Sequence, residues 1–198
     1  PISVNDEYKI KAKSFFKESF PKIITVSRLE KRKGHDKILM VIKNLKPKFP
    51  KIKYICIGNG KEKVSLLKLS EELSLKNDVV FLENIDKKLK SSLIAEANLF
   101  LMPSRIENKS TEGFGISFME AASYGVGSIG GKDGGASDAI MHNKTGLICD
   151  GNDLSSIYEN VCIFFKDKNY IGFGEEAQKL SDKFHWNKIV KNYLNLIN

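Results

Sequence analysis

The segment TEGFGISFMEAASYG places two carboxylates, Glu112 and Glu120, on either side of a glycine-containing turn. Gly113 and Gly115 allow the backbone to approach a ligand closely, and a helix beginning at Ile116 would present free N–H groups to a phosphate. Carboxylates repel phosphate, so their partners must be hydroxyls or cations. A nucleotide sugar, with hydroxyls on both sides of a diphosphate, satisfies this arrangement. The alternative is a helix-terminal acid followed by a surface glutamate.

A second segment, SRLEKRKGHD, supplies cations. Arg28 and Lys33 are five residues apart, and Gly34 permits a turn before a helix begins at the next residue. Two cations beside the start of a helix would neutralise a diphosphate. Lys31 and Arg32 are an equally good pair by spacing alone, and a solvated basic loop is the alternative without a ligand.

A third segment, GGKDGGASDAI, carries Gly134 and Gly135 ahead of a short helix that Ser137 or Asp138 would cap. This pattern predicts a second group of free backbone amides. A plain tight loop is the alternative.

Metal and dinucleotide chemistry are disfavoured by the sequence. The cysteines and histidines are widely spaced, so none of them forms a cluster with metal-ligand spacing. A G-x-G-x-x-G pattern that begins at Gly125 leads into a strand instead of following one, and no G-x-x-x-x-G-K-[ST] loop is present. We therefore expect no metal and no cofactor.

Short apolar runs alternate with amphipathic stretches, which predicts alternating strands and helices. The runs are rich in Val, Ile, Leu and Phe, as expected for strands buried on both faces of a parallel sheet. The predicted fold class is α/β, with a doubly wound, mostly parallel, Rossmann-like sheet and helices on both faces. The predicted strands are 22–27, 52–58, 78–82, 98–102, 126–130 and 146–149. The predicted helices are 35–46, 61–75, 87–97, 116–124, 136–142, 154–166, 170–183 and 186–197.

Glycine and polar residues follow most of the predicted strands. Gly58 follows the second strand, Ile85 lies just after the third and Ser104 follows the fourth, while the cationic segment follows the first. Ligands of such sheets bind outside the carboxyl ends of the strands. We therefore expect one binding site at this edge of the sheet.

The net charge of +8 comes almost wholly from lysine, since the chain has only three arginines. Lysines spread along the chain without interleaved aromatics disfavour nucleic acid as a partner, whereas an anionic membrane face or an acidic substrate stays open. No apolar run approaches the ~20 residues of a membrane span. No signal peptide or disulfide pattern is visible, so we expect a cytoplasmic protein, with the inner face of the membrane as an alternative. Because the first residue is Pro1, we expect a piece of a longer chain.

Together these segments resemble the C-terminal, donor-binding domain of a family-4 glycosyltransferase of the retaining GT-B type. The resemblance runs from about residue 22 to the end of the chain. The E-x(7)-E pair inside E-G-F-G-I-x-F-x-E-A, in order with the Arg–Lys element, is its most specific part. The motifs are V-S-R-L-x(3)-K-G-H-D at 26–36, I-G-x-G at 57–60, M-P-S-R at 102–105, E-G-F-G-I at 112–116, G-G-A-x-D-A at 134–139 and T-G-L at 145–147.

The resemblance implies that residues 21–198 bind a nucleotide-diphosphate sugar whose hexose is transferred, with retention and without a metal, to a glycan or a lipid-linked acceptor. The implied catalytic residues are Arg28 and Lys33, which hold the diphosphate as a leaving group, and Glu112, which binds hydroxyls of the sugar. Glu120 would bind the ribose, and Ile85 would lie near the base. The implied donor-binding residues are Gly113, Phe114, Gly115, Ile116, Glu120, Ile85, Gly58 and Ser104.

The resemblance also implies an N-terminal acceptor domain that this chain lacks. Residues 1–20 would then be a linker or an entry helix, and 186–197 a helix that crosses back to that domain. The chain by itself would be inactive, and peripheral association with the membrane is left open. Two alternatives remain: a sugar-nucleotide epimerase of the same fold, and a non-catalytic nucleotide- or phosphate-binding module.

Overall fold

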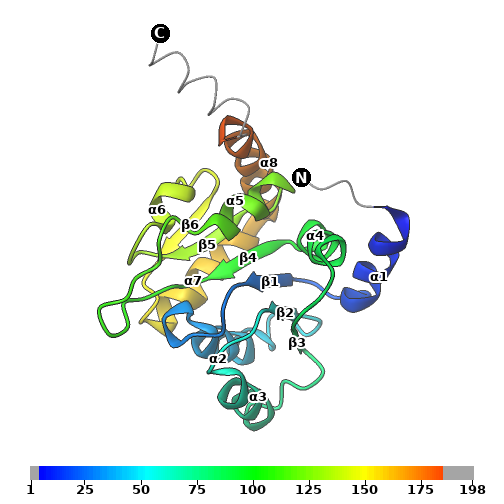
Figure 1. Cartoon of the computed structure of the whole chain (residues 1–198), viewed down its shortest axis with the longest axis vertical. Helices are drawn as coiled ribbons and strands as arrows, with labels where there is room; N and C mark the ends of the chain where they lie inside the picture. Colours follow the sequence, from blue (N-terminus) through cyan, green and yellow to red (C-terminus); the bar gives the residue numbers. More distant parts are fainter. Residues whose placement is uncertain (1–4, 185–198) are drawn as a thin grey trace.

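A computed structural model describes residues 5–184, and its centre is a six-stranded sheet (Figure 1). The strands lie in the order β3-β2-β1-β4-β5-β6, and every neighbouring pair is parallel. This is the strand order of the doubly wound Rossmann fold, so the predicted fold class is confirmed. The strands are β1 (Lys22–Val26), β2 (Lys53–Ile57), β3 (Val79–Leu82), β4 (Leu99–Met102), β5 (Ser128–Gly131) and β6 (Gly146–Cys149).

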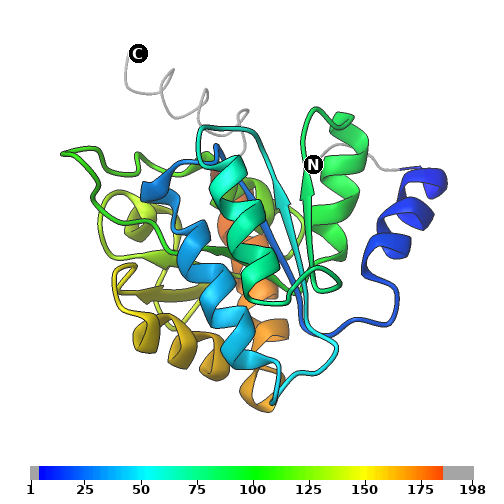
Figure 2. The ribbon, with the colours of Figure 1, turned by 90° about the horizontal axis from the view of Figure 1, so that it is seen from below.

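Helices cover both faces of the sheet (Figure 2). One layer contains α2, α3 and α7, the other contains α1, α4, α5 and α6, and α8 packs against α5 and α7. The α-helices are α1 (Asp6–Phe16), α2 (His35–Leu45), α3 (Lys63–Glu72), α4 (Lys87–Glu96), α5 (Ile116–Ser123), α6 (Ala136–Ala139), α7 (Leu154–Phe165) and α8 (Asn169–Ser181). The 3-10 turns are η1 (Lys31–Lys33), η2 (Lys166–Lys168) and η3 (Asp182–Phe184).

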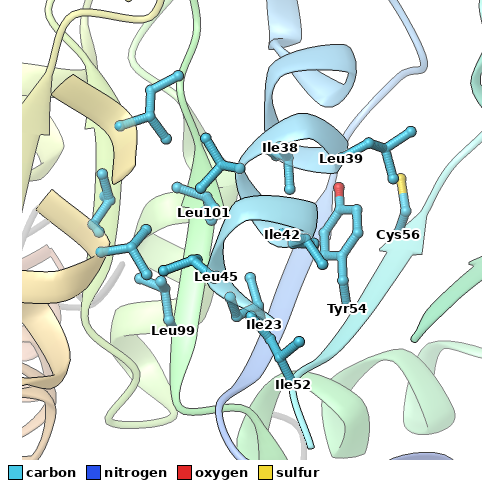
Figure 3. Packing of buried hydrophobic residues seen from close by; sticks show 14 of the residues in the cluster. Ile23, Ile38, Leu39, Ile42, Leu45, Ile52, Tyr54, Cys56, Leu99 and Leu101 are labelled. Carbon is cyan, nitrogen blue, oxygen red and sulfur yellow. The ribbon is translucent and has the colours of Figure 1, made fainter. Parts of the chain in front are cut away.

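The apolar stripe of α2 explains how one layer is held. Ile38, Ile42 and Leu45 recur at helical spacing and are fully buried. They pack over the central strands, beside Tyr54 of β2 and Leu99 of β4 (Figure 3). Burying each such aliphatic side chain contributes about 1.5–3 kcal/mol, so this stripe fixes the start of α2 above the sheet.

The segment before the sheet contains α1. The side chain of Asn5 caps this helix by accepting a hydrogen bond from the backbone N–H of Tyr8 at 3.3 Å. Ala12 and Phe16 are buried in the layer that also contains α4. The predicted helix 186–197 lies outside the described residues.

Most element boundaries differ from the sequence prediction by one to three residues, and two of these differences have a clear local reason. The end of α5 is a Schellman motif, in which Gly125 has φ 72° and Val126 N–H donates to the Ala121 carbonyl at 3.1 Å. Val126 therefore still belongs to the turn, and β5 begins two residues later than predicted. Helix α6 ends at Ala139 because Ile140 is extended.

The connections after β1 and β4 meet at the topological switch point. These two strands are neighbours at the centre of the sheet, and their connections lead to helices on opposite faces. Both connections lie side by side beyond the carboxyl ends of the strands in Figures 1 and 2. Gly34 has φ 77°, and a Cβ there would lie 2.5 Å from the Pro103 carbonyl oxygen. The two connections are therefore packed in direct contact.

A buried chain of hydrogen bonds anchors the end of β1. Thr25 donates to the Leu101 carbonyl, and Tyr54 donates to Thr25 Oγ1 at 3.0 Å, so the Tyr54 oxygen accepts from His35 Nδ1 at 3.1 Å. This direction leaves His35 Nε2 to accept from the Ser27 hydroxyl at 3.0 Å. Burial lowers the pKa of His35 to about 4, so the ring is neutral at pH 7.

We expect the free energy of unfolding to fall by about 2 kcal/mol between pH 7 and pH 5 because of His35. Its folded-state pKa of about 4 lies below the ordinary value of 6.5, so in this range the unfolded chain binds more protons. Stability is therefore present above pH 6.5 and is lost as pH falls toward 4. Urea unfolding at several pH values measures the slope, and His35→Gln should reduce it. A His35 ring that titrates near pH 6.5 by NMR would contradict this prediction.

Candidate functional site

The cations of the β1–α2 connection are positioned by a short turn. Strand β1 ends at Val26, and η1 then places Lys31, Arg32 and Lys33 against the loop that follows β4. Gly34 ends this turn in the left-handed conformation and is also the residue before α2. The backbone N–H of Arg105 donates to the Arg32 carbonyl at 2.8 Å, which ties the two connections together.

A continuous ion-pair network crosses the switch point, and we call it the rim network (Arg28, Glu30, Arg32, Lys33 and Glu112). Glu112 Oε2 accepts from Lys33 Nζ and, at 2.9 Å, from Arg32 Nη1. Glu30 joins Arg28 Nη1 at 2.7 Å and Arg32 Nε at 2.8 Å. The network thus brings together the three predicted catalytic residues, two directly and Arg28 through Glu30.

The rim network is unevenly exposed. The side chains of Lys33, Glu112 and Arg32 are 8%, 10% and 11% exposed, whereas that of Arg28 is 70% exposed. Burial lowers the pKa of Lys33, and the hydrogen bond and charge of Glu112 oppose that shift. Three cations and two carboxylates leave one net positive charge in the rim network. Such a cluster attracts an anion, and the exposed side chain of Arg28 is the most able of the three cations to change conformation and contact that anion.

The glycine turn lies directly beside the rim network. Gly115 has φ 71° and precedes the first turn of α5, whose leading amides have no partner within the helix. A Cβ on Gly113 would meet no atom of the described part of the chain within 4 Å, so these residues leave the backbone there uncovered. Gly135 N–H donates to the Glu112 carbonyl at 3.1 Å, which brings the third predicted segment to the same place.

Glu120 occupies a separate position on α5. Its carboxylate forms an ion pair with Lys90 at 2.6 Å, and it lines a pocket of about 470 Å³ together with Ile116 and Phe184. Phe114 is 39% exposed, and its ring lies 6.0 Å from that of Phe184. The pocket therefore adjoins the glycine turn on the side of α5 and η3.

The remaining predicted donor-binding residues lie along the same edge in different environments. Gly58 packs tightly on β1, because a Cβ there would lie 1.8 Å from the Ser27 carbonyl oxygen. Ile85 is half-buried and packs against the α4 layer. Ser104 is fully buried, and its hydroxyl has no hydrogen-bond partner among residues 5–184. Their contact with a donor stays a prediction.

Sequence reasoning missed three residues that organise the site. Glu30 was not singled out, and Arg32 was only an alternative cation. Arg105 is buried and holds Asp36 with two hydrogen bonds of 2.9 Å, so it joins the β4 connection to the first turn of α2. The available signal was that arginine, rare in this chain, occurs three times at this edge.

Two absences concern the described residues alone. Within residues 5–184, no group of three or more His, Cys, Asp or Glu side chains is arranged to hold a metal ion. Across the same span, no helix has the length and apolar character required to cross a membrane.

Fold and site together define a Rossmann-like α/β domain with a charged site at its topological switch point. The chain belongs to the family described as "Glycosyl transferases group 1", which matches residues 6–183. The predicted glycosyltransferase class and the GT-B type are thereby confirmed.

Curated relatives include two bacterial enzymes of about the same similarity. The GDP-mannose-dependent alpha-(1-6)-phosphatidylinositol monomannoside mannosyltransferase of Mycobacterium tuberculosis is 30% identical over 151 residues, or 75% of this chain and 39% of that protein. The N-acetyl-alpha-D-glucosaminyl L-malate synthase of Bacillus anthracis is 30% identical over 143 residues, or 71% of this chain and 36% of that protein. The chain thus spans well under half the length of either relative.

Solved structures of low sequence identity share the fold. A glycosyltransferase from Rickettsia africae has a TM-score of 0.81 at 18% identity, covering 98% of this chain and 52% of that one. Anabaena HepE, in complex with UDP and glucose, has a TM-score of 0.77 at 19% identity, covering 91% and 48%. The C-terminal domain of a group 1 glycosyl transferase from Francisella tularensis has a TM-score of 0.76 at 16% identity, covering 91% and 93%.

Proposed function

We propose that this chain is the donor-binding domain of a retaining, metal-independent family-4 glycosyltransferase that transfers a hexose from a nucleotide-diphosphate sugar. The observation that carries the proposal is the rim network beside the glycine turn. Lys33 and Glu112 come from the connections after β1 and β4, and both are nearly buried at the switch point. In sheets of this order, nucleotides bind at that point.

The diphosphate is proposed to lie between the cations and the first turn of α5. Free amides and the positive end of the helix dipole favour an anion there, and Gly113 leaves room for the backbone to approach it. Lys33 and Arg28 supply fixed positive charge as the sugar–phosphate bond breaks, which stabilises the leaving diphosphate electrostatically. This role needs no metal.

The two glutamates are proposed to bind hydroxyls on either side of the diphosphate. Glu112 would face the transferred sugar, and its Oε1 is the oxygen not engaged in the two ion pairs of Oε2. Glu120 would bind the ribose after exchanging its contact with Lys90. Ile85 would border the base.

The relatives support a nucleotide-sugar donor and leave its base open. The Mycobacterium relative is named as GDP-mannose-dependent, and Anabaena HepE was solved with UDP and glucose. These relatives differ in nucleotide, so the donor is a matter for measurement. A glycan or lipid-linked acceptor remains part of the proposal.

A second, acceptor-binding domain is also part of the proposal. The curated relatives extend far beyond the matched region, and the isolated C-terminal domain from Francisella tularensis is covered to 93%. The chain would therefore bind donor and turn over little or nothing alone. We further propose a cytoplasmic protein, with peripheral association with the membrane where the acceptor is a lipid.

Titration of the chain with UDP, GDP and ADP by calorimetry tests the proposal. We expect one of the three to bind with a clear preference, and its nucleoside monophosphate to bind much more weakly, because the second phosphate would lie at the rim network. Absence of binding to all three at millimolar concentration would contradict the proposed function.

A further inference from the structure

Glu30 is the common acceptor of two arginines in the rim network. Its Oε1 accepts from Arg28 Nη1 at 2.7 Å, and its Oε2 accepts from Arg32 Nε at 2.8 Å. A carboxylate that engages two guanidinium groups through separate oxygens fixes them at one separation. Glu30 is therefore the contact that restrains the otherwise exposed Arg28.

Arg32 is committed to protein acceptors. Beyond its contact with Glu30, its Nη1 donates to Glu112 Oε2 at 2.9 Å and to the Thr111 carbonyl at 3.1 Å. Its side chain is 11% exposed. Arg32 thus joins the turn after β1 to the segment after β4, and the same guanidinium orients the carboxylate of Glu112.

We propose that Glu30 and Arg32 form a positioning pair that orients the two outer groups of the site. Glu30 sets the direction of Arg28 toward the diphosphate, and Arg32 sets the direction of Glu112 toward the sugar. This inference rests on the proposed function of the site. Neither member of the positioning pair touches the donor.

The physical basis is the conformational freedom of long side chains. An exposed arginine has many rotamers, and a ligand that must order this side chain binds less tightly by the entropy that is lost. Glu30 removes part of this cost in advance. The carboxylate of Glu112 is restrained in advance in the same way by the planar guanidinium group of Arg32, whose geometry a lysine cannot reproduce.

Charge-conserving variants separate position from charge. Glu30→Asp keeps the carboxylate but shortens its reach to both guanidinium groups. We expect this variant to lower the affinities for a nucleoside diphosphate and for the matching nucleotide sugar equally, by about 5- to 10-fold. Arg28 is proposed to contact the diphosphate, which both ligands contain. The probes are UDP with UDP-glucose, GDP with GDP-mannose and ADP with ADP-glucose, and the pair that the wild type binds is used throughout.

Arg32→Lys should have a different signature. It keeps the positive charge but cannot hold Glu30, Thr111 and Glu112 from one planar group. We expect the affinity for the nucleoside diphosphate to stay within about 2-fold, while the preference for the nucleotide sugar falls by about 5- to 10-fold.

The neighbouring ion pair of Lys31 with Glu107 supplies matched controls. Its charged atoms are 3.6 Å apart at the same edge, and Lys31 belongs to the same turn. Lys31→Arg and Glu107→Asp should leave both affinities unchanged. Thermal unfolding of every variant checks that the fold is kept.

Neutral variants give a second readout that needs no ligand. The charges that act on Lys33 come from Glu112, Arg32 and Glu30: Arg32 lowers the pKa of Lys33, and Glu112 and Glu30 raise it. NMR titration of Lys33 should therefore show a higher pKa in Arg32→Gln and a lower one in Glu30→Gln. Arg32→Lys should show neither shift.

The outcomes separate the positioning pair from the proposed function. If the wild type binds the probes and both Glu30→Asp and Arg32→Lys bind them with the same affinities, the positioning pair is overturned and the proposed function stands. Equal losses in the Lys31 and Glu107 controls would also overturn it. A wild-type chain that binds none of the probes would overturn both.

Discussion

Replacing Lys33 with methionine should weaken the binding of the preferred nucleoside diphosphate by two to three orders of magnitude. Lys33 is the least exposed cation of the rim network, so its charge acts through a poorly screened environment. Methionine has a similar length and suits an apolar environment, so the fold should be retained. Calorimetric titration of UDP, GDP and ADP against both proteins measures the loss.

Lys31→Met is the matched control for this variant. Lys31 lies two residues away in η1, its side chain is 57% exposed, and it pairs with Glu107. The Lys31→Met variant should lose little affinity for the nucleoside diphosphate. A larger loss in Lys31→Met than in Lys33→Met would favour Lys31 and Arg32 as the cations that bind the diphosphate. In the wild type, affinity should fall as pH rises through the lowered Lys33 pKa, before an ordinary lysine titrates, because only the ammonium form attracts the diphosphate.

Glu112→Gln should separate the sugar from the nucleotide. We expect the affinity for the nucleotide sugar, relative to the nucleoside diphosphate, to fall by one to two orders of magnitude, or about 1.5–3 kcal/mol for hydrogen bonds to a charged group. The nucleoside diphosphate itself should not bind more weakly, since the amide no longer competes with the diphosphate for Lys33. Calorimetry with both ligands measures the two effects.

Two other carboxylates make this test specific. Glu107→Gln removes a charge from the same edge and should leave the ratio of the two affinities unchanged. Glu120→Gln should weaken both ligands equally, because the ribose is common to them. An unchanged ratio in Glu112→Gln would remove Glu112 from the sugar site.

The architecture was predictable because each strand is short and most of the strands are runs of apolar residues. β1 and β4 have no polar alternation, and no other period competes with the strand interpretation. Boundaries were less predictable where capping geometry decides them. Gly125 ends α5 through a left-handed turn, and this turn takes Val126 out of the predicted strand.

The grouping of Arg28, Lys33 and Glu112 at one edge of the sheet was predictable, because glycines and cations follow the strands, whereas the contacts between them were not. Spacing alone left Lys31 and Arg32 as an equally good cation pair, and the roles of these residues stay predictions. Sequence spacing does not reveal that Glu112 comes back onto η1 from about 80 residues away, since that contact depends on β1 and β4 being neighbours. Glu30 and Arg32 gain their importance only through this long-range contact.

The junction between β1 and β4 gives the rim network a mechanical consequence. Two register pairs join these strands, against three between β4 and β5 and five between β1 and β2, so the shortest pairing of the sheet lies between the half that contains β1, β2 and β3 and the half that contains β4, β5 and β6. At the carboxyl end, Arg105 and Arg32 connect the loops of the two halves. A ligand bound there would contact both halves of the sheet, so its binding free energy would oppose their separation. We therefore expect bound ligand to slow amide exchange in both halves together.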